Sequence, residues 1–123
     1  MRHSGWKDRI NALFQTQIPP EVDTENMGLY LRYMRERIRH PCYLVQSQED
    51  ETGFDALLVL ELLEEVDAEQ GILVRVSRSS DGRELVLPLA QLECCQEGSS
   101  NSELVDDFGR WFMFALLKRM GVS

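Results

Sequence analysis

The sequence contains few of the residues on which catalytic and phosphate-binding sites depend. Only two histidines are present, His3 near the amino terminus and His40 at the expected end of a helix. Neither forms a recognisable triad with a nucleophile and an acid. The glycines stand singly, as turn glycines do, and no glycine-rich phosphate loop is found. We therefore expect a protein that is not an enzyme.

Long apolar runs and disulfide patterns are also missing. No run approaches the roughly 20 apolar residues that span a bilayer, and the amino terminus lacks a signal-peptide pattern, so we expect a cytoplasmic protein without membrane contact. Cys42, Cys94 and Cys95 are odd in number and lack the spacing of a zinc site, which favours free thiols. Adjacent side chains on a strand point to opposite faces, so one of Cys94 and Cys95 should be buried and the other exposed.

Basic residues are fewer than acidic ones. Thirteen lysines and arginines against twenty-one aspartates and glutamates give a net charge of -8, which repels polyphosphates, so we expect no nucleic-acid partner. A basic stretch does occur at residues 32–40, and helical spacing places Arg32, Arg35 and Arg39 on roughly one side. We interpret it as a solvated helix face, although nucleic-acid binding through a local basic face stays open.

Two amphipathic helices are expected in the first third of the chain. Apolar residues at helical spacing predict a helix near residues 5–16, which the prolines at 19–20 prevent from continuing. A second helix, capped by Asp23 or Thr24, should end before Pro41. Its single apolar stripe consists of Met27, Tyr30, Leu31, Met34 and Ile38.

Several short strands should follow. Residues 42–45 are predicted to be extended, and the alternation in 72–78 and 84–88, with a turn sequence between them, predicts a β-hairpin. The segment 56–65 has high helix propensity but is apolar around most of a helix. We predict a strand over much of it, because a helix buried all round would need a larger core than 123 residues can build. A last short strand should pass through 93–94.

A long helix is expected at the carboxyl end. Ser100 and Glu103 have the spacing of a capping box, and the helix should run to about Met120 and end at Gly121. Its main apolar arc is Leu104, Val105, Phe108, Trp111, Phe112, Ala115 and Leu116. Four further apolar residues lie outside that arc and must pack against the first helix or a second subunit: Met113, Phe114, Leu117 and Met120.

The order helix, helix, short strands, helix predicts an α+β fold with an antiparallel sheet. A chain of 123 residues with 43% hydrophobic residues should form one domain around one core. Within it we distinguish an amino-terminal helical extension at 1–22, a helix plus sheet at 23–95, and a carboxy-terminal helix at 100–120.

Clustered acidic residues are the remaining candidates for a binding site. They are Glu64, Glu65, Asp67 and Glu69 in one loop, Glu49, Asp50 and Glu51 in another, and Asp106 with Asp107 near a helix start. Calcium takes roughly six to eight oxygen ligands, which such loops can supply in part. No EF-hand spacing is present: with Gly71 at the sixth loop position, the twelfth falls on Ser77 instead of a glutamate. Acidic loops that only maintain solubility are the competing interpretation.

Four stretches also carry a resemblance to a known family. They are Tyr30-Leu31 ahead of Pro41, Gly71 through Val74, Leu87 through Glu93, and Asp106-Asp107-Phe108 with Trp111. Over roughly residues 27–112 the chain resembles the small calcium-binding proteins first recognised in cyanobacteria, whose core is SH3-like. In that family a helix with a Tyr-Leu pair precedes a proline-started strand, a later strand ends in a Pro-Leu-Ala type turn, and an acidic-aromatic helix closes the fold.

The resemblance implies that the small, strongly bent antiparallel sheet is an SH3-like barrel flanked by amino- and carboxy-terminal helices. It also favours a strand over 56–65 and implies calcium as the bound ion. This chain departs from the family by an extra amino-terminal helix and a longer carboxy-terminal one.

The leading hypothesis is a calcium-binding protein that acts as a buffer or sensor through surface carboxylates. The candidate metal ligands are Glu64, Glu65, Asp67, Glu69, Asp106 and Asp107. The alternative is a non-enzymatic protein-interaction module or homodimer that uses the carboxy-terminal helix. Its candidate interface residues are Met113, Phe114, Leu117 and Met120.

Overall fold

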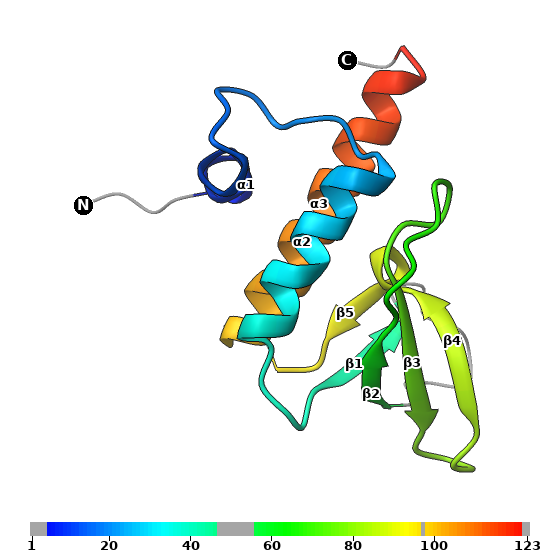
Figure 1. The fold of residues 1–123 in the computed structure, drawn as a ribbon. Helices are drawn as coiled ribbons and strands as arrows, with labels where there is room; N and C mark the ends of the chain where they lie inside the picture. Colours follow the sequence, from blue (N-terminus) through cyan, green and yellow to red (C-terminus); the bar gives the residue numbers. More distant parts are fainter. Residues whose placement is uncertain (1–4, 47–55, 97, 122–123) are drawn as a thin grey trace.

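Three helices and five strands make up the described part of the chain, residues 5–46, 56–96 and 98–121 of a computed structural model (Figure 1). In chain order the elements are α1 (Trp6–Phe14), α2 (Thr24–Arg37), β1 (Tyr43–Gln46), β2 (Leu57–Leu62), β3 (Leu73–Arg78), β4 (Glu84–Pro88), the 3-10 helix η1 (Leu89–Gln91), β5 (Leu92–Cys94) and α3 (Ser100–Arg119). No helix within these ranges is both long and apolar enough to cross a membrane.

The five strands form one antiparallel sheet in the order β4-β3-β2-β1-β5. Leu44 on the short strand β1 pairs with Leu57 of β2 on one side and with Cys94 of β5 on the other. The α+β class and the antiparallel sheet are therefore confirmed. The expected barrel is an open sheet instead, because β4 and β5 stand at its two edges among the described residues.

The segment with conflicting signals, 56–65, contains the strand β2, as predicted. Leu57, Val59 and Leu62 point into the core, and the register shift between Val59 and Glu61 changes which alternate residues face inward. Burial on the sheet outweighs helix propensity here, because β2 lies between β1 and β3 and pairs with both.

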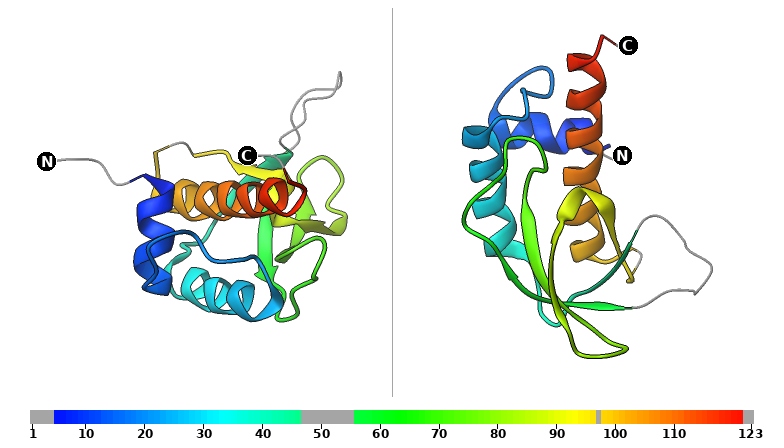
Figure 2. Two further views of the ribbon diagram at one scale, coloured as in Figure 1. Left: turned by 90° about the horizontal axis from the view of Figure 1, so that it is seen from above. Right: turned by 90° about the vertical axis from the view of Figure 1, so that its right-hand side faces the viewer.

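The helices form two layers beside the sheet. α2 and α3 lie side by side against one face, and α1 lies crosswise on their far side, away from the sheet (Figures 1 and 2). The carboxy-terminal turns of α3 extend beyond both α2 and the sheet. As a result, only the first part of α3 is enclosed by the core.

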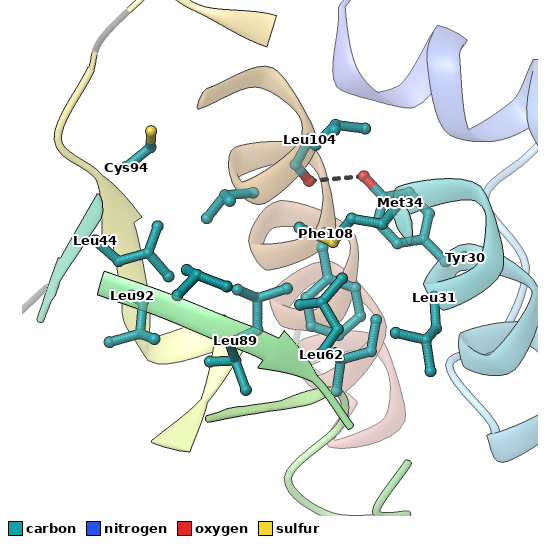
Figure 3. Close-up of a cluster of buried hydrophobic side chains, with 14 of the residues drawn as sticks. Tyr30, Leu31, Met34, Leu44, Leu62, Leu89, Leu92, Cys94, Leu104 and Phe108 are labelled. Atoms are coloured by element: carbon teal, nitrogen blue, oxygen red, sulfur yellow. Dashed lines mark hydrogen bonds between the residues drawn. The ribbon is translucent and has the colours of Figure 1, made fainter. Parts of the chain in front are cut away.

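The core between α2, α3 and the sheet is rich in aromatic rings. Phe108 and Trp111 are fully buried. The centre of the Tyr30 ring lies 5.7 Å from the centre of the Phe108 ring and 5.8 Å from that of the Trp111 ring. The Tyr30 hydroxyl donates a 2.7 Å hydrogen bond to the Leu104 carbonyl of α3 (Figure 3). Burial raises the pKa of the Tyr30 hydroxyl above its ordinary value. This hydroxyl therefore acts as a neutral donor that ties α2 to α3.

The cysteines have the expected placement. Cys42 and Cys94 are buried and Cys95 is exposed, and all three are free thiols. Burial, together with the neighbouring Cys94, raises the pKa of the Cys42 thiol to about 12. Cys42 is therefore an inert core residue on the same face as the buried Leu44.

The predicted capping box at the start of α3 is wrong by one residue. The N-cap is Ser99, whose hydroxyl accepts a 3.1 Å hydrogen bond from the Ser102 amide. The side chain of Asn101, two residues later, is buried and bonds both backbone groups of Arg39, at 2.9 Å to its amide and 2.7 Å to its carbonyl. The start of α3 is thus set by a contact with the segment that follows α2, which local spacing does not reveal.

α1 is fixed to α3 by an ion pair and by ring contacts. The Arg9 guanidinium donates two hydrogen bonds to Asp107, from Nε at 2.7 Å and from Nη2 at 2.9 Å. Phe14 packs on Trp111 at 5.2 Å, and Trp6 packs edge-on against Phe114 at 5.5 Å. The first helix therefore has the docking surface that its short length requires.

Removal of the Arg9 guanidinium should destabilise the protein markedly. Asp107 is only 6% exposed, and in Arg9→Ala its carboxylate loses both hydrogen bonds from the guanidinium. Because the Arg9 side chain is itself 30% exposed, water can replace part of the loss, and we expect a cost of about 2–3 kcal/mol in urea unfolding. The double variant Arg9→Met/Asp107→Leu should recover most of it, and the surface control Arg32→Ala should stay within about 0.5 kcal/mol. If Arg9→Ala lowers the free energy of unfolding by less than about 0.5 kcal/mol, the ion pair with Asp107 does not hold α1 on α3.

Glycine is required at position 71 for two reasons. Gly71 has φ +83°, and a Cβ there would lie 3.0 Å from Phe112 and 3.1 Å from Phe108. Gly82 has a similar φ of +72° with open space around it, so it serves as a matched control. Gly82→Ala should cost about 1 kcal/mol from backbone strain alone, whereas Gly71→Ala should cost about 2–4 kcal/mol because overpacking adds to it. If the two variants lose the same free energy of unfolding in urea, the rings of Phe108 and Phe112 move aside at no cost and the overpacking argument is wrong.

Candidate functional site

The acidic loop, defined here as residues 63–71, joins β2 to β3 and contains four of the predicted ligands. A pair of backbone hydrogen bonds between Asp67 and Gly71, at 2.9 and 2.8 Å, closes its last five residues, which we call the base of the loop. Gly71 is buried in contact distance of Phe108 and Phe112. The loop is therefore seated on α3 through Gly71, while the side chains of Glu64, Glu65 and Glu69 are exposed.

Asp67 organises the turn of the acidic loop. Its Oδ1 accepts hydrogen bonds from the backbone amides of Glu69 at 2.7 Å and Gln70 at 2.8 Å. These bonds, that of Gln70 above all, lower the pKa of the Asp67 carboxyl, so the group is charged at neutral pH. No hydrogen bond reaches Oδ2 from the described residues. One carboxylate oxygen is thus held in place while the other stays open to solvent.

The three glutamates of the loop are exposed. The side chain of Glu64 is 86% exposed, and its Oε1 lies 4.0 Å from Nη1 of Arg35. That arginine donates a hydrogen bond to the Leu62 carbonyl and so stays beside the loop. Glu65 and Glu69 are also exposed. An exposed ion pair at 4.0 Å is weak, so all three side chains can rotate toward a ligand at little cost.

The two aspartates of α3 have different environments. Asp107 is buried and engaged by Arg9, whose Nη1 also lies 3.5 Å from Glu103. The hydrogen bonds to Asp107 raise the pKa of Arg9 above its ordinary value, so the guanidinium is charged at every ordinary pH. Asp106 is exposed. A cation at Asp107 would therefore have to displace a guanidinium that already balances its charge.

The carboxylates do not form a preformed metal cage in the described ranges. Among those residues no group of three or more His, Cys, Asp or Glu side chains is close enough together to hold a metal ion. Glu49, Asp50 and Glu51 lie outside the described residues. The acidic loop consequently has the oxygen donors and the negative charge that calcium prefers. Its carboxylates do not converge on one point as they would in a rigid site.

The predicted interface residues separate into two groups. Phe114 is covered by Trp6 and by Lys7, whose Nζ lies 4.8 Å from the ring centre. Met113, Leu117 and Met120 are instead 52%, 39% and 66% exposed. The first helix therefore accounts for one of the four, and the other three form an exposed apolar stripe.

Sequence reasoning missed two residues of this region. Leu116 was expected in the buried arc of α3 and is 37% exposed, because the last turns of the helix extend beyond the sheet. Arg9 was not identified as the partner of Asp107, and no local signal could have shown it, since 98 positions separate them.

Comparison with known proteins identifies the family. Residues 20–112 match a family model described as calcium binding, Calci_bind_CcbP. No curated protein and no solved structure matches the chain. The matched range includes α2, the whole sheet with the acidic loop, and α3 as far as Phe112, whereas α1 lies outside it. The match supports calcium as the bound ion, and the chain belongs to this family of calcium-binding proteins.

Proposed function

We propose that this protein is a calcium buffer that binds the ion through the surface carboxylates of the acidic loop. The observation that carries the proposal is the placement of Asp67, a charged carboxylate with one oxygen held by two backbone amides and one open, inside the range that matches the calcium-binding family. Glu64, Glu65 and Glu69 surround it along the loop and supply further oxygens.

The geometry supports weak binding. Calcium affinity depends on the number of charged ligands and on the rigidity of the site, and loosely organised sites bind at about 10⁻⁴–10⁻³ M. Four carboxylates on one nine-residue loop supply the charge, but three of them belong to exposed glutamates whose ordering costs side-chain entropy. Water would complete the six to eight oxygens that calcium takes.

A buffer fits better than a sensor because the base of the acidic loop is clamped. A sensor needs an element with two arrangements that the ion can switch. The Asp67–Gly71 backbone pair and the contact of Gly71 with Phe108 hold the loop base in one arrangement. Ligand movement can therefore stay within the exposed glutamates and leave the core unchanged.

Neutralising the loop glutamates should weaken calcium binding selectively. In isothermal calorimetry of metal-free protein, Glu64→Gln/Glu65→Gln/Glu69→Gln should lower the affinity for calcium at least tenfold. The matched control Glu25→Gln/Glu36→Gln/Glu93→Gln removes three exposed charges on α2 and β5 and should change it less than about threefold, because long-range charge effects are screened. If both triple variants lose calcium affinity equally, binding depends on the overall negative charge of the protein and not on the acidic loop. Absence of heat at millimolar calcium would refute the proposal.

The role of Asp67 in the turn should depend on pH. Its folded pKa is lowered, so the stability it contributes is complete above the unfolded value of about 4 and is lost as pH falls through the folded value. Asp67→Asn keeps an oxygen acceptor for the two amides but carries no charge. Urea unfolding should therefore show wild type more stable than Asp67→Asn at pH 6, with the difference becoming smaller as pH falls below about 4. A difference that does not change with pH would exclude the charge as its origin.

A second candidate function is a protein-interaction module. It is favoured by the exposure of Met113, Leu117 and Met120 on a helix whose buried residues end at Trp111. Large apolar side chains that gather on one exposed face mark contact sites more often than isolated ones do. This function uses α3 and not the glutamates of the acidic loop, so it is compatible with calcium binding.

A further inference from the structure

A pocket lies between the connection from α1 to α2 and the carboxy-terminal half of α3. The connection passes beside these turns of α3 (Figure 1). The pocket has a volume of about 300 Å³, which falls at the lower end of the range for small-molecule sites. The connection contributes its two prolines and Val22 to the apolar lining, and α3 contributes Phe114 and Ala115.

Two hydrogen bonds tie the walls of the pocket together. Nε1 of Trp111 donates to the Pro20 carbonyl at 2.8 Å, and Nη2 of Arg119 donates to the Val22 carbonyl at 3.1 Å. Both acceptors belong to the connection, and both donors belong to α3. The two adjacent prolines also restrict the backbone of the connection, since each fixes its own φ. The pocket is therefore formed before a ligand arrives, which lowers the entropy cost of binding.

The pocket is apolar inside and charged at its mouth. Val22 is buried, and the two prolines, Phe114 and Ala115 are half-buried. The charged lining residues are exposed, and they are Glu21, Lys118 and Arg119. The Phe114 ring packs edge-on against Trp6 of α1, so it is held in place from outside the pocket. This lining offers a rigid surface to the apolar body of a ligand.

The charged groups at the mouth favour an anion. The two cations outnumber the single carboxylate, which leaves the lining with one net positive charge in a protein whose net charge is -8. Among the described residues, no carboxylate forms an ion pair with Lys118 or Arg119. Lys7 adds a third positive charge nearby, because its Nζ lies 4.8 Å from the centre of the Phe114 ring. Arg119 keeps further N–H donors besides the one that reaches Val22, so a carboxylate would gain charge-assisted hydrogen bonds.

The pocket is separate from the calcium-binding part of the chain. Of the eight residues that line it, five lie outside the range 20–112 that matches the family model, namely Pro19 and the four residues from α3. No residue of the acidic loop lines it. A function of this pocket would therefore be additional to calcium binding and independent of it.

We propose that this pocket binds a small monocarboxylate with an apolar body, which lies against Phe114 and the two prolines with its carboxylate beside Lys118 and Arg119. An apolar lining with a few polar groups that fix the orientation of the ligand is the usual composition of a small-molecule site. The opposing charge of Glu21 selects one negative charge over two, because a second carboxylate would be repelled.

The probe for this proposal is hydrocinnamate, a phenyl ring on a short carboxylate arm, and hydrocinnamamide is its uncharged control. An NMR titration of metal-free protein should show saturable shifts of the backbone amide signals of Ala115 and Lys118. The amide signal of Glu69 in the acidic loop should not shift. Hydrocinnamamide should bind about tenfold more weakly than hydrocinnamate, because it has the same shape without the charge.

Substitutions at the pocket should act in opposite directions. Ala115→Leu fills the pocket and should weaken binding of hydrocinnamate about tenfold, whereas Ala12→Leu at an exposed position of α1 should change it less than about twofold. Lys118→Gln should weaken binding about threefold, and Glu21→Gln should strengthen it about twofold. Arg32→Gln removes an exposed charge of α2 and should change binding less than about 1.5-fold, because distant charges are screened.

Three results would overturn the proposal. If hydrocinnamate and its amide bind equally, charge does not select the ligand. If Ala115→Leu binds hydrocinnamate as wild type does, the ligand lies elsewhere. If no amide signal shifts at millimolar hydrocinnamate, Lys118 and Arg119 serve only to offset the dipole of α3.

Two further measurements separate binding from folding and from calcium. The thermal unfolding midpoint of each variant shows whether it folds, and the exposed changes Lys118→Gln and Glu21→Gln test the charge argument even if Ala115→Leu does not fold. Calcium calorimetry of Lys118→Gln should match wild type, so the pocket and the acidic loop can fail independently.

Discussion

The rest of the structure depends on the burial of one aromatic face of α3. Phe108 and Trp111 are fully buried, and four separate segments meet their rings. Tyr30 brings α2, Gly71 brings the base of the acidic loop, and Phe14 brings α1. The indole Nε1 also donates a 2.8 Å hydrogen bond to the Pro20 carbonyl, which holds the connection between the first two helices. Each aromatic side chain buries a large apolar area, so a few of them can stabilise a domain with one small core.

The same aromatic face links the core to the acidic loop and to the exposed apolar stripe of α3. The acidic loop can expose its carboxylates because Gly71 lets the chain approach Phe108 and Phe112 closely. Beyond Trp111 the helix passes the sheet, and its next apolar residues have no described element to cover one side. The two sites are thus neighbours along α3, with Glu69 and Leu116 lining one cavity between them.

The negative charge of the protein is divided between structural and available carboxylates. Asp107 is neutralised by Arg9, and Arg75 bridges Glu61 of β2 and Glu84 of β4 across the sheet at 2.8 and 2.7 Å. These acids stabilise the fold or its surface and are already paired. The glutamates of the acidic loop are paired weakly or not at all among the described residues, which is why the excess charge can serve a cation there.

The sequence by itself determined the elements and much of their chemistry. Periodicity and breakers predicted the three helices and the hairpin, since these signals act over a few residues. The strand at 56–65 was predicted against its local helix propensity, from the limited size of the core and from the family resemblance. Only the tertiary structure decided that the sheet is open, that Asp107 is occupied by Arg9, and that Leu116 is exposed while Phe114 is covered. Each of these outcomes depends on contacts between distant parts of the chain. The availability of a carboxylate or an apolar face is a property of its neighbours in space, which a local pattern does not contain.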